Sequence, residues 1–429
     1  MSAQNVVLIT IDSLRSDHVG FLSKEVDNTP QMDELAADAA LSTDATSPSS
    51  HTRASVPALL SSQYPHRYFA NFFGDVEMPT LSTYLSEEGY DTAAFHSNPL
   101  LSRHFGYEEG FDEFYDGLRF VESTHLPETV AGAYSKLVRL LSRFPYEPAE
   151  EITERARAWL SEVREPFFLW VHYMDPHGPY ALSRRSGYID KYRSERLWQK
   201  AVESPDEVTA TERERLKAAY RDEVGHTDEY IGRLVKAVDV TAGETILGLT
   251  GDHGEEFYEH GQYAHPAELY ETTTNVPLII DVPGMDRTVD STTPQSGLDI
   301  VPTILDVLDI EPRTELVGRS LQPVLQGDRL DREYVITETN RGKDVVLGTR
   351  SQRWKYIVDG EDRELYDLSA DPNEQNDLSG TEEAVESQLK EFLATHVDTH
   401  DIEAGNKLAM VADDMDTEVR DRLDDLGYL

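Results

Sequence analysis

The chain has 429 residues, of which 39% are hydrophobic, so it can bury a large core and is not disordered overall. It carries 81 acidic and 39 basic residues, a formal net charge of -42, and it has no cluster of Lys or Arg, which disfavours nucleic acid as a partner. It contains no cysteine, which excludes disulfides, thiolate metal ligands and a cysteine nucleophile.

The acidic residues are spread along the whole chain. A local acidic tail would indicate a partner-binding segment, whereas a uniformly acidic surface indicates a salt-rich solvent that screens the self-repulsion. We therefore expect a halophilic protein. The first residues lack the basic region of a signal peptide, and no apolar run approaches the roughly 20 residues that cross a bilayer. We expect a soluble, cytoplasmic protein with no transmembrane segment.

Continuous apolar runs alternate with amphipathic segments over the first three quarters of the chain. The run at residues 6–11 is typical of a buried parallel strand, and similar runs follow at 92–95, 167–172, 245–250 and 277–282. Between them, apolar residues recur three and four apart, most clearly at 31–40, 80–88 and 218–238. This alternation predicts an α/β fold with a mostly parallel central sheet flanked by helices.

The pattern changes after about residue 330. Short β-rich segments at 334–338, 345–349 and 354–358 are separated by charged turns, and a helix is predicted around 382–396. These segments predict a smaller C-terminal antiparallel sheet plus a helix. We expect two closely packed parts, a catalytic α/β domain over residues 1–330 and an α+β subdomain over residues 331–429.

Acidic and histidine side chains follow three of the predicted strands. Asp12 directly follows the first strand, Asp252 and His253 follow the strand at 245–250, and Asp175 and His177 follow the strand at 167–172. In open α/β sheets, ligands bind beyond the carboxyl ends of the strands. A single Asp at such a place more often caps the next helix. Three such strand ends together predict a cation site with oxygen and imidazole ligands.

Short motifs along nearly the whole chain share one order with a known family. They include Asp-Pro-His at 175–177, Gly-Asp-His-Gly-Glu at 251–255 and Leu-Tyr-Glu at 269–271, with further matches at 5–12, 29–36, 89–92, 110–112, 259–265, 276–279, 299–303, 354–357, 364–368, 371–372 and 426–429. Each motif is weak by itself. Together and in this order they resemble the sulfatase family of the alkaline phosphatase superfamily.

The resemblance implies an alkaline phosphatase-like fold and a metal-dependent hydrolase of sulfuric or phosphoric esters. The substrate would be a small-molecule, glycan or lipid ester. One divalent metal ion would be bound by Asp12, Asp252, His253 and the hydroxyl of the nucleophile, and calcium is the ion that the family implies. The resemblance also implies that His177 and His265 contact the ester oxygens or assist the leaving group.

The nucleophile is where the sequence departs from the family. Sulfatases usually carry Cys or Ser followed by x-Pro-x-Arg, which is converted to formylglycine, whereas residues 47–62 read SPSSHTRASVPALLSS. One register uses Ser49 with Arg53. The other, counted back from Leu59 and Leu60 without a gap, places Thr52 at the position of the nucleophile. We favour Thr52, as an unmodified hydroxyl that a metal activates.

Other departures concern the charge around the ion. The family's lysine after the Gly-Tyr-x-Thr strand is absent, and the chain reads His-Ser-Asn-Pro at 96–99, in which Asn98 can hydrogen-bond an ester oxygen. Ser13 stands where a second Asp is common, which makes manganese, magnesium or zinc alternatives to calcium. Arg53 and Arg15 can supply positive charge to the pocket, or form ion pairs on the surface instead.

Three functions are compatible with these residues. The first is a hydrolase with Thr52 as nucleophile. Because threonine has one hydroxyl, its covalent ester must be cleaved by water or by an acceptor alcohol. Cleavage by an alcohol makes a phosphoryl or phosphoglycerol-type transferase the second function. The single hydroxyl also favours a phosphate ester as substrate. The third is a non-catalytic relative that binds anionic glycans, but such a protein has no need to keep Asp12, Thr52, Asp252 and His253.

Overall fold

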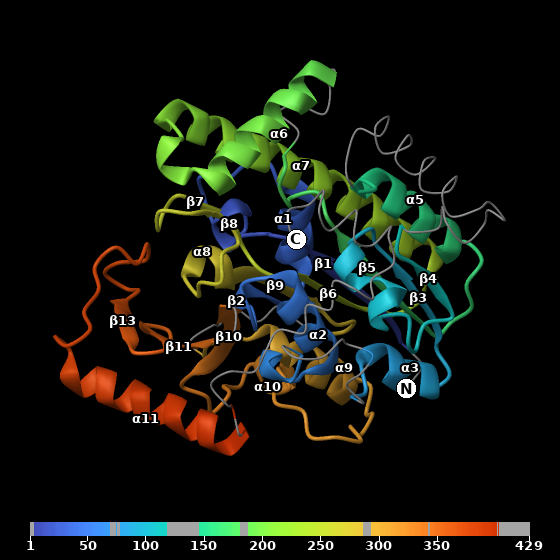
Figure 1. Ribbon diagram of the computed structural model, residues 1–429. Coiled ribbons are helices and arrows are strands. Elements are labelled where there is room, and N and C mark those ends of the chain that lie inside the picture. Colours follow the sequence, from blue (N-terminus) through green and yellow to red (C-terminus); the bar gives the residue numbers. More distant parts are fainter. Residues whose placement is uncertain are drawn as a thin grey trace.

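A seven-stranded sheet forms the centre of the computed structural model, which describes residues 4–68, 74, 78–117, 146–180, 188–285, 293–341, 344–400 and 402 (Figure 1). Its strands are β1 (Asn5–Ile11), β2 (Leu41–Thr46), β3 (Asp91–Phe95), β4 (Glu113–Tyr115), β5 (Phe167–Tyr173), β6 (Thr245–Gly251) and β9 (Asn275–Asp281). They lie in the order β2-β9-β6-β1-β5-β3-β4. Neighbours from β6 to β4 are parallel, which confirms the predicted mostly parallel sheet.

One predicted strand has the wrong direction, and two strands were not predicted. β9 covers the apolar run at 277–282 but is antiparallel to both β6 and β2, because a buried strand is apolar on both faces whichever way it runs. The β2 sequence LSTDAT has no continuous apolar run, and β4 has only three residues. A period-based prediction has no signal at either place.

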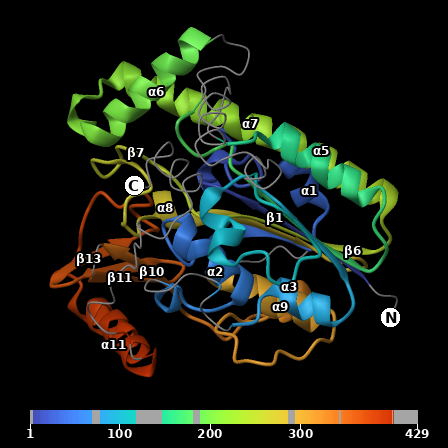
Figure 2. The same ribbon diagram turned by 45° about the vertical axis from the view of Figure 1, so that its right-hand side comes forward.

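Helices cover both faces of the central sheet (Figure 2). One face packs against α1 (Pro30–Asp38), α5 (Ala149–Leu160) and α7 (Ala210–Thr241), and the other against α2 (Thr52–Ser61), α3 (Leu81–Glu87) and α9 (Ile300–Val307). In β1, Val7 and Ile9 point to the first face and Val6 and Leu8 to the second, all without solvent exposure. This burial on both sides explains the continuous apolar sequence of β1. The remaining helices are α6 (Tyr188–Glu203), α8 (Glu271–Thr274) and α10 (Gln322–Leu325).

The longest helix, α7, starts eight residues before the predicted segment at 218–238 because a capping box fixes its first turn. The Thr209 hydroxyl accepts a hydrogen bond from the Glu212 backbone N–H at 3.3 Å, and the Glu212 carboxylate accepts one from the Thr209 N–H at 2.9 Å. Two of the free N–H groups of the helix end are satisfied in this way.

The second sheet is antiparallel and has four strands, β10 (Val335–Arg341), β11 (Asp344–Arg350), β12 (Trp354–Asp359) and β13 (Asp362–Asp367). It packs with α11 (Glu383–His400) around a core that includes Tyr356, Leu365 and Leu389, and it lies to one side of the central sheet (Figure 1). This confirms the predicted smaller sheet plus helix, while the division at residue 330 stays a prediction. The motif at 426–429 lies outside the described residues.

A backbone hydrogen bond joins the C-terminal sheet to the segment between β2 and α2. The Glu338 N–H of β10 donates to the carbonyl of Pro48 at 2.9 Å, four residues before α2 begins. A two-stranded ribbon, β7 (Glu256–Phe257) with β8 (Tyr263–Ala264), follows β6. The C-terminal sheet is therefore anchored close to the residue that opens α2.

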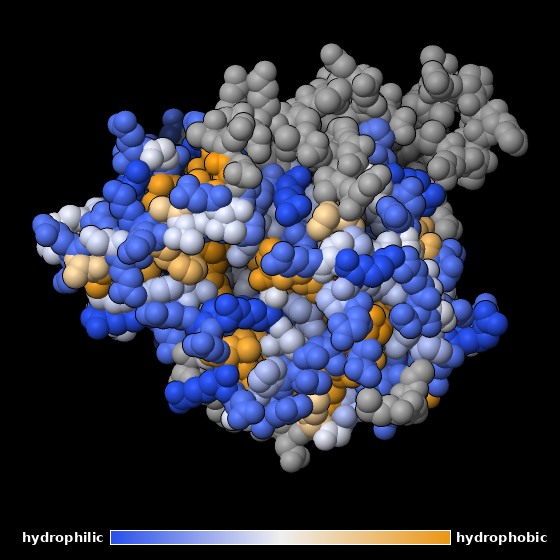
Figure 3. Space-filling view, turned by 90° about the horizontal axis from the view of Figure 1, so that it is seen from below, coloured by the Kyte–Doolittle hydropathy of each residue, from blue (hydrophilic) through white to orange (hydrophobic). Residues whose placement is uncertain are grey.

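The surface of the described part is mainly polar. The face in Figure 3 is mostly hydrophilic, with hydrophobic residues in small separate groups. Among the described residues, Val202 and Val240 are the large hydrophobic side chains that are exposed. No helix in the described ranges has both the length and the apolar character needed to cross a bilayer.

Candidate active site

The carboxyl ends of β1 and β6 place two acidic side chains next to each other. Asp12 follows β1 and Asp252 follows β6, and the strand pairing continues one residue past both ends. The Asp12 N–H donates to the Tyr173 carbonyl at 2.8 Å, and the Asp252 N–H donates to the Ile11 carbonyl at 3.1 Å. Both carboxylates are fully buried. The parallel register therefore fixes the two groups side by side, as expected for strands that end at one edge.

Thr52 is the first residue of α2 and touches this pair. Its Oγ1 lies 3.2 Å from Asp12 Oδ2 and 3.1 Å from His253 Nε2, and the side chain is fully buried. The unpaired N–H groups and the dipole at a helix N-terminus stabilise negative charge on an oxygen placed there. Ser49 is also buried, but its Oγ makes no hydrogen bond within the described part of the chain. The fold thus brings Thr52, rather than Ser49, to Asp12.

His253 presents an unprotonated nitrogen to the carboxylates. Its Nδ1 lies 2.8 Å from the Gly254 carbonyl, which only accepts, so Nδ1 carries the proton. Its Nε2 lies 3.6 Å from Asp252 Oδ2. Burial lowers the pKa of His253 well below its ordinary value, and the charge of His265 lowers it further. A neutral imidazole held by a backbone carbonyl in this way is a common metal ligand.

Asp12 is surrounded by donors. Asn98 Nδ2 donates to its Oδ2 at 3.0 Å, the Ser13 hydroxyl donates to its Oδ1 at 3.0 Å, and His172 Nε2 lies 3.5 Å from Oδ2. Burial by itself raises the pKa of Asp12, but the nearby imidazoles, His177 first among them, outweigh it and hold the pKa well below the usual range. Asp12 is therefore ionised.

The negative charge of Asp252 is less well balanced by neighbouring donors than that of Asp12. Its Oδ1 accepts hydrogen bonds from the N–H groups of Ser13 at 3.1 Å and His253 at 2.7 Å, whereas its Oδ2 has no hydrogen-bond partner among the residues that the structure describes. Burial raises the pKa of Asp252 well above its ordinary value, and the charge of Asp12 raises it further. A cation between the two carboxylates would remove this repulsion.

The side chains present fit a divalent metal ion. Ligand atoms of Asp12, Asp252 and His253 all lie within 4.8 Å of one another, and all three residues are buried. Two carboxylates, one imidazole and an adjacent hydroxyl form a mixed oxygen and nitrogen donor set, which suits zinc or manganese as well as the harder calcium and magnesium ions. The orphaned Oδ2 of Asp252 is an acceptor that such an ion would satisfy.

Two further histidines lie against this cluster. The His265 ring centroid is 4.7 Å from that of His253 and 5.0 Å from that of His177, and His265 Nδ1 lies 3.7 Å from Glu255 Oε2. Burial lowers the pKa of His265, but Glu255 outweighs it and the net pKa is raised. Burial lowers the pKa of His177. The pKa values of the two imidazoles beside the cluster are thus shifted in opposite directions.

Other candidate residues have structural contacts. Asp175 caps α5, because its Oδ2 accepts the Ala149 N–H at 2.7 Å, so the third strand end contributes His177 to the cluster and not a carboxylate. Arg15 is buried in ion pairs with Asp17 at 2.7 Å and Glu259 at 3.2 Å, so its charge is already neutralised. Arg53 follows Thr52 on the first turn of α2 and is half-buried, and its contact with an ester oxygen stays a prediction.

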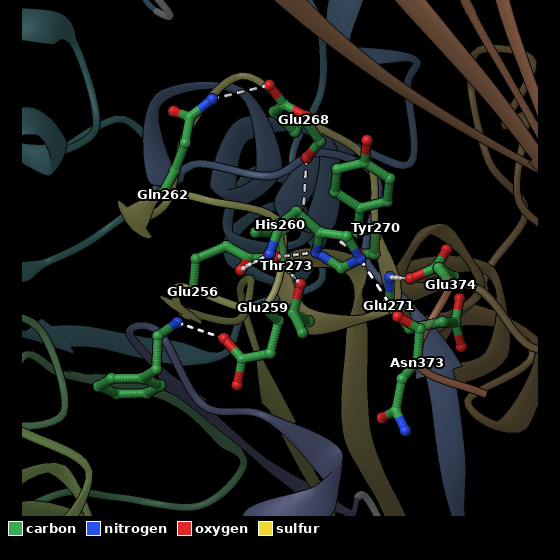
Figure 4. A network of polar contacts seen from close by, with 12 residues as sticks. Glu256, Glu259, His260, Gln262, Glu268, Tyr270, Glu271, Thr273, Asn373 and Glu374 are labelled. Atoms are coloured by element: carbon green, nitrogen blue, oxygen red, sulfur yellow. Dashed lines mark hydrogen bonds and ion pairs between the residues drawn. The ribbon is translucent and has the colours of Figure 1, made fainter. Parts of the chain in front are cut away.

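His260 belongs to a separate polar network (Figure 4). Its Nδ1 lies 2.7 Å from Glu256 Oε1, its Nε2 lies 3.2 Å from the Asn373 carbonyl, and its ring stacks on Tyr270 at 3.7 Å between centroids. These contacts join the β7–β8 region to the segment after β13.

The sequence interpretation missed two residues of the cluster, His172 and Glu255. His172 is the only strongly polar residue in β5, and its Nδ1 lies 2.9 Å from Thr10 Oγ1 in the neighbouring strand. Strand alternation, which puts it on the face opposite Tyr173 and one residue from the strand end, is a signal that could have found it. Glu255 closes the Gly-Asp-His-Gly-Glu motif at 251–255, which was already singled out.

A mostly parallel sheet with helices on both faces, and with carboxylate, imidazole and hydroxyl groups gathered at the carboxyl ends of its strands, is the fold of the alkaline phosphatase superfamily. A family model described as "Sulfatase" matches residues 4–310, and the chain belongs to the sulfatase family. A second model, "N-sulphoglucosamine sulphohydrolase, C-terminal", matches residues 258–399.

Individual relatives have low identity, and the share of each chain that they cover varies from about half to nearly all. The chain is 28% identical over 278 residues to arylsulfatase K of Gallus gallus. The aligned region spans 53% of this chain and 52% of arylsulfatase K, so the chain covers only about half the length of that relative. It is 25% identical over 444 residues to the Delta 4,5-hexuronate-2-O-sulfatase of Bacteroides thetaiotaomicron, covering 91% and 87% of the two chains. The solved structure of the phosphonate monoester hydrolase of Agrobacterium radiobacter has a TM-score of 0.73 at 21% identity, covering 92% and 96%, which shows a shared fold.

Proposed function

We propose that the protein hydrolyses sulfuric or phosphoric monoesters with Thr52 as its covalent nucleophile. The observation that carries the proposal is the position of Thr52 Oγ1, which is 3.2 Å from Asp12 Oδ2 and 3.1 Å from His253 Nε2 at the first residue of a helix. A hydroxyl is a weak nucleophile unless a neighbouring base or cation activates it, and the Asp12, Asp252 and His253 group beside Thr52 is a candidate site for such a cation.

Asp12, Asp252, His253 and the Thr52 hydroxyl would hold one divalent ion. When bound, such an ion would polarise the ester oxygens and lower the pKa of the hydroxyl. Asn98 donates to Asp12 and fixes that carboxylate in place. His265, whose pKa is raised by Glu255, is placed to balance the charge of the bound sulfuryl or phosphoryl group, a role that no lysine takes at residues 96–99.

In the first half-reaction, Thr52 Oγ1 attacks the sulfur or phosphorus atom and the bond from that atom to the alcohol oxygen breaks. The Thr52 hydroxyl gives up its proton to solvent as it is activated, because the pKa of Asp12 is held well below the usual range and this carboxylate is too weak a base to keep the proton. The leaving oxygen takes a proton from His265, the imidazole whose pKa is raised by Glu255 and whose ring lies beside that of His177. The products are a free alcohol and a sulfate or phosphate ester of Thr52.

In the second half-reaction, water attacks the same atom and the bond to Thr52 Oγ1 breaks. His265 accepts a proton from the water, and the released Thr52 oxygen takes up a proton from solvent, so both groups are restored. Threonine has a single hydroxyl and cannot expel the anion by forming a carbonyl, so an external nucleophile is required for turnover. An acceptor alcohol in place of water would give the transferase variant of the same chemistry.

The relatives support the reaction class, and they leave two substrate classes. Arylsulfatase K and the hexuronate sulfatase are named for sulfate esters, and the structural neighbour is a phosphonate monoester hydrolase. We propose a phosphate or phosphonate monoester as the preferred substrate. The covalent ester on an unmodified threonine must be hydrolysed by water, and a phosphoryl group on threonine suits this step.

The proposal is tested by ester hydrolysis with defined metals in high-salt buffer. Chelator-stripped protein is reloaded with calcium, manganese, magnesium or zinc and assayed on aryl sulfate, aryl phosphate and aryl phosphonate monoesters. Metal-dependent turnover that is fastest on a phosphorus ester is expected. Faster aryl sulfate turnover contradicts the substrate proposal, and glycerol conjugates in the product mixture identify the transferase.

A further inference from the structure

A second cluster of histidines around a buried carboxylate lies where the C-terminal sheet meets the central domain. Glu338 is in the middle of β10, His396 is in α11, and His66 belongs to a short helical turn at Pro65–Arg67 that follows α2. None of these residues lies in the candidate active site. The three come from widely separated parts of the sequence and meet only because the two sheets pack together.

The distances in this cluster are short. His66 Nδ1 lies 3.0 Å from Glu338 Oε2 and 3.2 Å from Oε1, and His396 Nε2 lies 2.6 Å from Oε1. Ligand atoms of all three side chains lie within 4.8 Å of one another. His400, one helical turn after His396, has its ring centroid 4.8 Å from that of His396 and 5.9 Å from that of His66. Two imidazoles therefore contact one carboxylate, and a third packs beside them.

The cluster is shielded from water. Glu338 is 0% exposed, and His66 and His396 are 9% and 7% exposed. The Tyr64 ring packs edge-on against the rings of His396, at 4.5 Å, and His400, at 4.9 Å. The buried Glu338 carboxylate, in contact with the rings of His66 and His396, offers oxygen and nitrogen ligands of the kind that a cation binds.

We propose that His66, Glu338 and His396 bind a divalent transition metal ion of the zinc class, and that a turn of the neighbouring His400 side chain toward the ion supplies the fourth ligand. Imidazole nitrogens and carboxylate oxygens lie at 2.0–2.2 Å from zinc, so the ligand atoms of a tetrahedral site are about 3.3 Å apart. The observed separations of 2.6 to 3.2 Å need to widen by about 0.1 to 0.7 Å to reach this spacing. His396 and His400 stand four residues apart on one helix face, a spacing that lets both point at one ion.

The site would join three elements of the molecule. It would fix α11 to β10 and to the turn after α2, the helix that starts with Thr52. The alternative occupant of the cluster is a proton, which would leave a hydrogen-bonded His–Glu–His contact with no ion. The two states are distinguished by zinc binding: the metal-bound cluster takes up one zinc ion, and the protonated cluster takes up none.

The test is metal binding by the full-length chain after chelator treatment. Zinc is titrated calorimetrically into wild type, His396→Gln and Asp398→Asn; Asp398 is an exposed carboxylate on the same helix and serves as the matched control. The active-site ligands are removed separately with Asp12→Asn/Asp252→Asn, so that loss of the first metal and loss of the second are distinguished. Circular dichroism checks the fold of each variant.

The expected result is one zinc equivalent in the Asp12→Asn/Asp252→Asn protein, with binding retained in Asp398→Asn and weakened in His396→Gln. The weakening should exceed the roughly 10–100-fold that loss of an outer-shell partner costs, because a direct ligand is lost. Cobalt bound to the Asp12→Asn/Asp252→Asn protein should give the intense visible bands of a tetrahedral nitrogen-rich site, a readout that does not depend on the folding of His396→Gln. Absence of zinc and cobalt binding in that protein, or equal affinity in His396→Gln and Asp398→Asn, overturns the proposal.

Discussion

Thr52→Ala should abolish turnover, whereas Ser49→Ala should leave it nearly unchanged. The two residues form a matched pair, since both are small, buried hydroxyl residues that lie three positions apart. Only Thr52 contacts Asp12 and His253, at 3.2 and 3.1 Å. Without its Oγ1 no atom remains to form the covalent ester, and kcat should fall at least about a thousandfold, or about 4 kcal/mol of transition-state stabilisation.

The effect on stability should be much smaller than the effect on rate. Thr52→Ala removes two hydrogen-bond contacts, each worth about 1 kcal/mol net, so the protein should remain folded at 25 °C. Thr52→Ser keeps the hydroxyl and removes one buried methyl group, which costs about 0.8 kcal/mol of burial, and should keep kcat within about tenfold. Initial rates on aryl phosphate and thermal unfolding midpoints are measured for all three variants. Loss of turnover in Ser49→Ala together with retained turnover in Thr52→Ala would refute the assignment.

Three further predictions concern the metal, the buried charges and the acidic surface. Asp252→Asn should lose active-site metal, seen by elemental analysis, because it removes the oxygen that has no hydrogen-bond partner among the described residues; unchanged metal content counts against the ligand set. Burial raises the pKa of Glu271, but Arg350 and Lys355 outweigh it and lower the pKa from 4.5 to about 2. The ionised Glu271 therefore contributes about 3 kcal/mol to the free energy of unfolding above pH 4.5, and this contribution is lost as the pH falls towards 2. Urea unfolding of Glu271→Gln should therefore show a smaller stability loss between pH 6 and pH 3 than wild type, and parallel curves contradict this. The thermal midpoint of wild type should rise with KCl concentration, since salt screens the net charge of -42, and a midpoint independent of salt speaks against a salt-adapted surface.

Much of the fold follows from local sequence because burial on both sheet faces leaves a strong pattern. β1 and β5 are buried along their whole length, and their continuous apolar sequences predict them directly. Strand direction is different, because it depends on the connection and not on composition, so β9 was predicted as a strand but with the wrong direction. β2 is held by its pairing with β9 and has no strong pattern of its own.

The candidate site divides in the same way. Parallel register puts the residues after β1 and β6 side by side, so the proximity of Asp12 and Asp252 could be predicted from their strands alone. The direction of a side chain beyond a strand end could not, and Asp175 turns to cap α5. The cluster at Glu338 had no sequence signal, because it depends on how α11 packs against the central domain.

The substitution of threonine for the formylglycine precursor changes what the rest of the site must do. A formylglycine hydrate can release its anion by an internal step, so its site needs to activate only one attack. A threonine ester requires a second attack by an outside nucleophile, and the group that removes the proton from that nucleophile must be available again after the first step. His265 meets this requirement, since Glu255 lies 3.7 Å from its Nδ1 and raises its pKa, so that it can give a proton to the leaving alcohol and then take one from water. In the proposed reaction, the carboxylate-supported His265 would therefore make full turnover by Thr52 chemically feasible without formylglycine.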